Sequence, residues 1–152
     1  MLQKTNNIDF VKSIVIDNIP NTEIKESPIH GFGLFAIKVI SAQSTVCVLD
    51  GQVIDWDKYE SNHLSLKGDT GDLEEYFFME WNALDTKTLL VRPFRTKYSY
   101  INHSKTPNVK VLSFPHRIIA LKDIEIGEEL TINYNDEPLR DDYFTSEKEF
   151  LK

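Results

Sequence analysis

The sequence predicts a mostly β fold with a short α component. Short runs of β-branched, aromatic and aliphatic residues recur along the chain with turn residues between them, and only brief stretches suggest helix. With 41% hydrophobic and 27% charged residues, the composition is typical of a globular chain rather than a disordered one. A chain of 152 residues is expected to form one domain with a core of its own.

The formal net charge of −7 bears on the expected partners. Binding to nucleic acid needs a basic surface, so we expect no direct nucleic-acid contact. An acidic protein suits a basic partner such as a Lys/Arg-rich peptide. The alternative is that the charge serves solubility alone, and net charge does not separate the two.

Membrane and secretion signals are lacking in the sequence. No apolar run reaches membrane-spanning length, and residues 1–7 have no apolar stretch of the kind that opens a secretion signal. We therefore expect an intracellular protein, cytoplasmic or nuclear, with no membrane partner. The single cysteine, Cys47, permits no internal disulfide and lies in an apolar run, so we expect a packed thiol rather than a nucleophile.

Short strands dominate the first half of the chain. The turn signal Asp50-Gly51 predicts that the strands on either side of it pair as a hairpin. Asp55 is placed to cap a short helix that continues to Glu60. The expected strands are residues 10–16, within a loosely defined start of the chain, then Glu23–Glu26, Leu34–Ile37, Thr45–Leu49 and Gln52–Ile54.

Two hairpins and a last strand are expected in the second half. The charged segment 138–152 is expected to be a loosely docked helix. His30, His63 and His116 are interpreted as solvated turn residues, and since no histidine is spaced with acids as ligands are, we predict no metal site. The predicted hairpins pair Tyr76–Trp81 with Thr88–Arg92 and Val109–Leu112 with Arg117–Leu121, and the last strand is Leu130–Tyr134.

Two polar motifs are candidates for binding. Gly31-Phe32-Gly33 lets the backbone approach a ligand closely or take positive φ, although a tight strand connection explains it equally well. Asn102-His103-Ser104, followed by Pro107-Asn108, presents an amide and an imidazole next to predicted strands. Taken alone, this second motif is also compatible with an ordinary Asx/Pro turn.

Together with a third segment, these motifs resemble the SET-domain protein lysine methyltransferases. The third segment is Gly127–Thr131 followed by Tyr134, and the likeness extends from about Glu23 to Asp136. It implies an N-terminal extension at 1–22, a SET domain at 23–136 and a C-terminal segment without zinc at 137–152. The implied fold is a β-clip of small curved sheets with a C-terminal pseudoknot, a threading that physical rules alone do not predict.

The resemblance also implies S-adenosylmethionine as methyl donor and a protein or peptide lysine as acceptor. By that likeness, the backbone of Gly31, Phe32 and Gly33 holds the methionine part of the donor. Asn102 and His103 hold its amino and adenine groups. Tyr134 is the implied catalytic residue, at the point where donor and lysine meet.

The substrate channel departs from the family pattern. Leu49 stands where a Tyr-x-Gly tyrosine is common, and the run around Val111 lacks an aromatic residue that many relatives carry. The number of methyl groups added is therefore left open. A degenerate SET module that binds a peptide without turnover is the alternative. Tyr143 or Phe144 is a candidate cover for the cofactor, and a homodimer is a candidate way to complete the groove.

Overall fold

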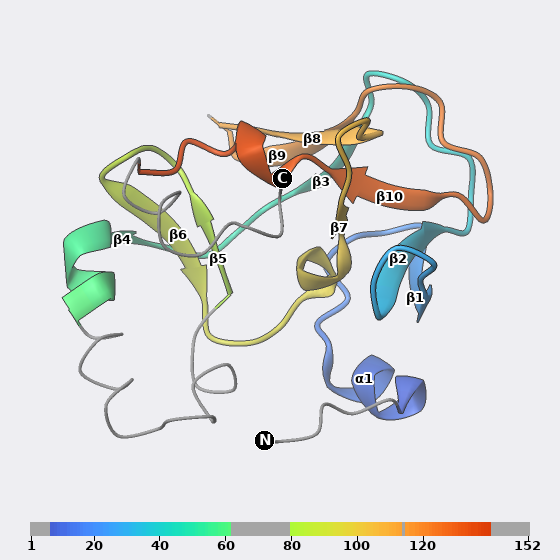
Figure 1. Ribbon diagram of the computed structural model, residues 1–152, viewed down its shortest axis with the longest axis horizontal. Coiled ribbons are helices and arrows are strands. Elements are labelled where there is room, and N and C mark those ends of the chain that lie inside the picture. The colour runs from blue at the N-terminus through green and yellow to red at the C-terminus, as the bar shows by residue number, and fades with distance from the viewer. Residues whose placement is uncertain (1–6, 62–79, 114, 141–152) are drawn as a thin grey trace.

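Three small sheets make up most of the computed structural model of the chain, which describes residues 7–61, 80–113 and 115–140 (Figure 1). The first sheet has the strand order β1 (Thr22–Glu26), β2 (Phe32–Ala36), β10 (Glu129–Ile132) and β7 (Asn102–His103). The second has β3 (Thr45–Val48), β9 (Arg117–Ala120) and β8 (Val109–Leu112), and the third has β4 (Gln52–Asp55), β6 (Thr88–Arg92) and β5 (Glu80–Ala83).

Helical segments in the described ranges are short. They are α1 (Ile8–Ile14), the 3-10 turns η2 (Lys97–Tyr100) and η3 (Tyr134–Asp136), and residues 56–61. The predicted mostly β fold class is therefore confirmed. The predicted cap is present as well, since Asp55 accepts a hydrogen bond from the Lys58 backbone N–H at 3.2 Å. The threaded C-terminal crossing stays an expectation of the family resemblance.

Two predicted hairpins are present. β8 and β9 pair in antiparallel register from Val109↔Ala120 to Leu112↔Arg117. β5 and β6 pair from Glu80↔Arg92 to Ala83↔Leu89, and the part of the first predicted strand before Glu80 lies outside the described residues. In both cases two apolar runs are joined by a connection short enough for adjacent strands to pair.

The predicted hairpin at Asp50-Gly51 is wrong. β3 pairs with β9 and β4 pairs with β6, so the chain passes from one sheet to another at this point. The position of Leu49 is fixed by its backbone N–H, which donates to the His116 carbonyl at 2.9 Å. A Cβ on Gly51 would lie 2.6 Å from the Val91 carbonyl oxygen, so the glycine serves close approach to β6 rather than chain reversal.

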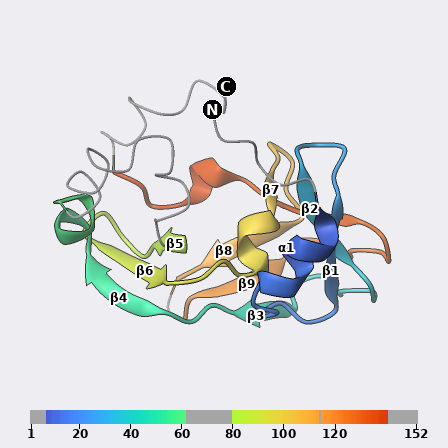
Figure 2. The ribbon, with the colours of Figure 1, turned by 90° about the horizontal axis from the view of Figure 1, so that it is seen from below.

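The predicted strand at residues 10–16 is also wrong, because Ile8–Ile14 forms α1. Asn7 caps the helix by accepting a hydrogen bond from the Phe10 N–H at 3.0 Å. Val11 is the one buried residue of the helix. Figure 2 shows α1 beside β1, so the helix lies at the edge of the molecule and away from the centre of the first sheet.

The last described strand, β10, is central to the first sheet. It pairs antiparallel with β2 through Leu130↔Leu34 and parallel with β7 through Thr131↔Asn102 and Ile132↔His103. Its predicted extension to residue 134 is too long, because the strand ends at Ile132. The consequence is that three segments far apart in the sequence meet in one sheet.

A buried ion pair fixes the segment that leads into β7. Arg92 Nε donates to Glu80 at 2.6 Å, and the same carboxylate accepts hydrogen bonds from Ser99 Oγ and from both the N–H and the hydroxyl of Thr96. Burial opposes ionisation of Glu80, but hydrogen bonds from Ser99, Thr96 and Arg92 hold its pKa below the ordinary value. The β5–β6 hairpin therefore anchors η2, and η2 continues into Ile101 and Asn102.

In the described ranges, no helix is both long and apolar enough to cross a membrane.

Candidate functional site

The turn before β2 brings Gly31 to the face of the first sheet. Ser27 N–H donates to the Gly31 carbonyl at 2.8 Å, and Ser27 Oγ accepts from the Ile29 N–H at 2.9 Å. Gly31 has φ of 49°, a conformation that side chains rarely adopt, and open space lies where its Cβ would be. A ligand therefore has access to the backbone at this turn.

Asn102 is tied to that turn by its side-chain amide. Its Nδ2 lies 2.7 Å from Glu129 Oε1, 3.1 Å from Ser27 Oγ, and 3.2 and 3.3 Å from the carbonyls of His30 and Phe32. Four oxygens surround the two N–H bonds of the amide, and this fixes which way it points. We call these residues, with Gly33, the cradle.

The cradle is completed by contacts among Ser27, Glu129 and Gly33. Ser27 Oγ donates to the Glu129 carboxylate, at 2.8 and 2.9 Å from its two oxygens. A Cβ on Gly33 would overlap this carboxylate and would lie 3.0 Å from Ser27 Cβ. Glycine at position 33 therefore admits Glu129, and Glu129 in turn orients Asn102.

The outer side of the cradle presents groups that could hold the amino-acid part of S-adenosylmethionine, the donor implied by the resemblance. In the part of the chain that the structure describes, Asn102 Nδ2 is engaged while Asn102 Oδ1 receives no hydrogen bond. An amide oxygen accepts from an ammonium group, and the turn backbone at Gly31 is open beside it. The residues that the sequence assigned to the donor, Phe32 and Asn102 among them, are therefore brought together.

His103 and Tyr134 meet next to the cradle. The Tyr134 N–H donates to His103 Nδ1 at 3.2 Å, and the two rings lie 5.2 Å apart. The Tyr134 hydroxyl donates to the Ile101 carbonyl at 2.7 Å. Burial, and then the charge of Glu137, raises the pKa of Tyr134 to about 12, so the hydroxyl keeps its proton at neutral pH.

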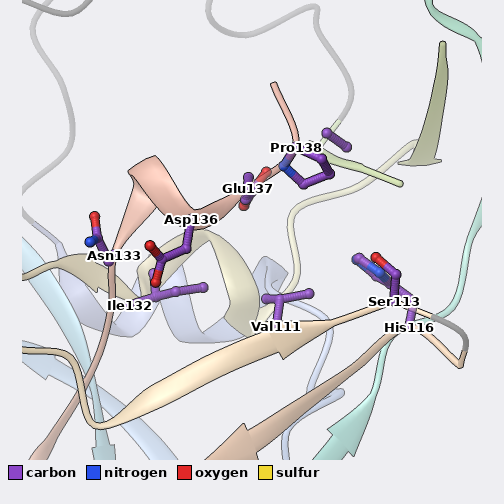
Figure 3. Close-up of a pocket in the computed structure, with 9 residues that line it drawn as sticks. Val111, Ser113, His116, Ile132, Asn133, Asp136, Glu137 and Pro138 are labelled. Carbon is purple, nitrogen blue, oxygen red and sulfur yellow. The ribbon is translucent and has the colours of Figure 1, made fainter. Parts of the chain in front are cut away.

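A pocket adjoins η3, the 3-10 turn that begins at Tyr134, and we call it the η3 pocket. Figure 3 shows Asp136 and Glu137 along one wall, with Val111 and His116 across from them. The predicted channel residue Val111 thus lines a cavity, whereas Leu49 is buried in the core and does not. The lining residues are Ala83, Val111, Ser113, His116, Ile132, Asn133, Asp136, Glu137 and Pro138.

His116 is not the solvated turn residue that the sequence suggested. Its side chain is buried, at 9% exposed, and lines the η3 pocket opposite residues of η3 and the segment that follows it. Burial, and then the charge of Arg92, lowers the pKa of His116 to about 4. Neither ring nitrogen has a hydrogen-bond partner among the described residues.

Three residues of the site, Ser27, Glu129 and Tyr98, were assigned no role from the sequence. Ser27 and Glu129 lie 102 positions apart and meet only because β2 pairs with β10. Tyr98 packs its ring under the Arg92 guanidinium, 5.6 Å away, and donates from its hydroxyl to Glu137 at 2.6 Å. Glu129 was visible in the Gly-Glu-Glu segment, whereas Tyr98 carried no signal beyond its place before the Asn-His motif.

Other predicted features fall outside the site or outside the described residues. Asn108 is structural, since its Oδ1 accepts from the Thr131 N–H at 2.8 Å and its Nδ2 donates to the Glu129 carbonyl at 2.8 Å. Cys47 is buried, and burial raises the pKa of its thiol to about 11, as expected of a packed thiol. His63, Tyr143 and Phe144 lie outside the described residues.

Comparison with known proteins agrees with this geometry. The SET domain family model matches residues 31–135, and the chain belongs to the SET-domain family. It is similar to a protein of Dictyostelium discoideum named histone-lysine N-methyltransferase set1, with 33% identity over 122 residues. That match covers 74% of this chain but only 8% of the Dictyostelium protein. Members of this family are typically protein lysine methyltransferases.

Proposed function

We propose that the protein is an S-adenosylmethionine-dependent protein lysine N-methyltransferase. The observation that carries the proposal is the hydrogen bond from Tyr134 to the carbonyl of Ile101, the residue directly before Asn102. One backbone segment thereby joins the donor cradle to the tyrosine beside the η3 pocket. A donor held on one side and an amine entering from the other would meet at Tyr134.

The bound donor would supply a methyl group on a sulfonium, so that a C–N bond forms as the C–S bond breaks, a thioether leaves and the amine's proton goes to solvent. Asn102 Oδ1 would accept from the donor's ammonium. The backbone at Gly31, Phe32 and Gly33 would hold its carboxylate end, and His103 its adenine. These assignments rest on the fit of the cradle described above.

The chain's own residues would then align the two reactants. A free lysine has a pKa of about 10.4 and must lose a proton before it attacks. The positive sulfonium of the bound donor would disfavour the ammonium form near the point of transfer, whereas the carboxylates of Asp136 and Glu137 elsewhere in the pocket favour it. Tyr134 is protonated at neutral pH and its one O–H is donated to the Ile101 carbonyl, so the hydroxyl is suited to accept a hydrogen bond from the amine and to shape the channel rather than to remove a proton. Alignment and exclusion of water would supply most of the acceleration.

Calorimetric titration of S-adenosylmethionine and S-adenosylhomocysteine tests the cofactor site. A ligand that binds only the folded state stabilises it by about 2.7 kcal/mol at a hundredfold excess over Kd, so thermal melts serve as a second readout. Asn102→Ala is expected to weaken binding by at least tenfold. Asn135→Ala is the matched control, because Asn135 is a neighbouring but exposed asparagine. A folded protein that binds neither compound would refute the proposal.

A substrate lysine within a basic segment is the acceptor we propose, since the chain carries a net charge of −7. The related Dictyostelium protein is named for histone lysine, so a histone tail is a rational first peptide. Methylation should fall as ionic strength rises, because salt screens attraction between exposed charges. Equal rates on neutral and basic peptides at all salt concentrations would exclude electrostatic selection.

The second candidate is a SET module that binds a basic peptide without turnover. Leu49 and Val111 favour it, because both stand where relatives often carry a channel aromatic. Saturable peptide binding in the presence of S-adenosylmethionine, without methylated product by mass spectrometry, would favour this candidate. Methyl transfer that Tyr134→Phe slows by tenfold or more would exclude it.

A further inference from the structure

We propose that His116 is the hydrogen-bond partner of the substrate's amine in the η3 pocket, opposite an acidic wall formed by Asp136 and Glu137. The pocket would thus select a cationic side chain of lysine type. This inference rests on the proposed function for the reaction, but the contact itself can be measured without turnover.

The first observation is that His116 is buried without partners. Its side chain is 9% exposed, and neither Nδ1 nor Nε2 has a hydrogen-bond partner among the described residues. Buried polar groups nearly always have partners, and an unsatisfied one in a native protein calls for a reason. A partner that arrives with the substrate gives that reason.

The second observation is the place of His116. It lines the η3 pocket together with the predicted channel residue Val111, and Figure 3 shows the two on the same side. The His116 carbonyl also binds the N–H of Leu49, the other predicted channel residue. His116 therefore lies beside Val111, where a channel aromatic is missing, and its ring supplies polarity that Val111 lacks.

The opposite wall carries charge. Asp136 and Glu137 both line the pocket, and Tyr98 fixes Glu137 by donating to its Oε1 at 2.6 Å. Two carboxylates facing an imidazole attract a cation and repel an anion. The acidic pair alone would not define a site, but together with the unpartnered imidazole it indicates a ligand that is positive and can donate a hydrogen bond.

The protonation state of His116 suits this role. With its pKa lowered to about 4, by burial and then by the charge of Arg92, the imidazole is neutral at pH 7 although Asp136 and Glu137 face it. A neutral imidazole has one nitrogen that accepts a hydrogen bond. It can accept an N–H of the amine and leave the amine lone pair directed at the donor. The second side-chain torsion of histidine is broad, so the ring can turn a nitrogen toward the pocket at little cost.

A matched pair of variants tests the contact in catalysis. His116→Phe keeps the shape of the ring and removes both nitrogens, whereas His116→Gln keeps a donor and an acceptor. We expect His116→Phe to lower kcat/KM for a lysine peptide by about tenfold, the equivalent of one hydrogen bond, and His116→Gln to restore part of it. Binding of S-adenosylhomocysteine should be unchanged in both, because the cradle is separate. Equal activity of wild type and His116→Phe would overturn the proposal.

Histidine NMR tests the contact without methyl transfer. The ring signals of His116 are assigned by their loss in His116→Phe. Adding a basic peptide with S-adenosylhomocysteine should shift them when the peptide carries its target-position lysine, and not when norleucine replaces that lysine. Identical shifts with both peptides, or none while the lysine peptide binds, would overturn the role of His116. Failure to bind S-adenosylhomocysteine would instead count against the proposed function, and the NMR comparison can then be made with peptide alone.

Discussion

Asn102 and His116 are both 9% exposed, and they lie in two parts of the candidate site, the cradle and the η3 pocket. The Asn102 amide has four oxygens within 3.3 Å of its nitrogen, whereas His116 has no hydrogen-bond partner among the described residues. The nitrogen of the Asn102 amide is thus satisfied by the protein itself, and the His116 ring is not. A polar side chain that folding leaves without partners points to a ligand more clearly than one that folding has engaged.

The largest expected effect comes from removing the support that both regions share. Arg92→Met leaves the Glu80 carboxylate buried without its cation and should destabilise the protein by about 3–5 kcal/mol, measured by urea unfolding. Both cofactor binding and the η3 pocket should fail together, since η2 and Tyr98 depend on this pair. In the double variant with Glu80→Met the loss should be smaller, and an equal or greater loss would contradict the account of an uncompensated charge.

The pH dependence of the free energy of unfolding should distinguish the η3 pocket, which contains His116, from the cradle. The pKa of His116 is about 4 in the folded state and 6.5 ordinarily, so the unfolded chain binds more protons between these values. Stability should therefore fall as pH drops from 6.5 to 4, by roughly 3 kcal/mol from this residue, and no further below. His116→Leu should lack this component and be as stable as wild type or more so at pH 7. If the stability of wild type and His116→Leu falls equally between pH 6.5 and 4, His116 is not buried as a neutral imidazole.

Gly33→Ala should lower the free energy of unfolding, whereas His116→Leu should leave it unchanged or raise it at pH 7. The difference arises because the glycine change disrupts hydrogen bonds that the cradle already makes. The added Cβ displaces the Glu129 carboxylate from Ser27 and Asn102, which should cost about 1–3 kcal/mol and weaken cofactor binding. Calorimetry and thermal melts measure both effects. In a Glu129→Ala background the same glycine change should cost less. If its cost is undiminished there, the glycine serves backbone conformation rather than space for Glu129.

Tyr134→Phe is expected to have the smallest effect on stability. It removes one hydrogen bond to the Ile101 carbonyl, worth about 0.5–1.5 kcal/mol. Because the pocket and the cradle both adjoin Tyr134, methyl transfer should fall far more than stability does. Comparing the unfolding free energy with single-turnover rates checks this, and a loss of activity that merely tracks unfolding would contradict a role at the site.

Sequence patterns predicted the local features of this protein well. Strands bounded by turn residues, the hairpins ending in Arg92 and Ala120, and the motif that contains Asn102 could all be read along the chain. One failure is local, because part of the segment predicted as a strand at residues 10–16 forms α1. The others are non-local. Asp50-Gly51 looks like a hairpin turn, yet its flanking strands find better partners in β9 and β6. His116 looks like a surface residue in the sequence, yet it is buried in the fold, and no local pattern encodes that burial.

The site residues divide in the same way. Asn102 and His103 belong to a compact motif, and their neighbours in sequence identify them. Ser27 and Glu129 act on Asn102 only after β2 and β10 have paired, and Tyr98 acts through Glu137, 39 positions away. Side chains that orient other side chains across sheets are therefore the part of the site that sequence reasoning misses.

The position of β10 between β2 and β7 also sets an order of assembly. β10 is the last described strand to leave the ribosome, and its partners precede it by about 95 residues on one side and about 30 on the other. Contacts of such long range form slowly, because a large loop must close before they stabilise anything. A nascent chain that ends before Glu129 would hold Asn102 without the carboxylate that orients it. The protein should therefore gain its donor site in one late folding step, and a chain interrupted in synthesis would be inert.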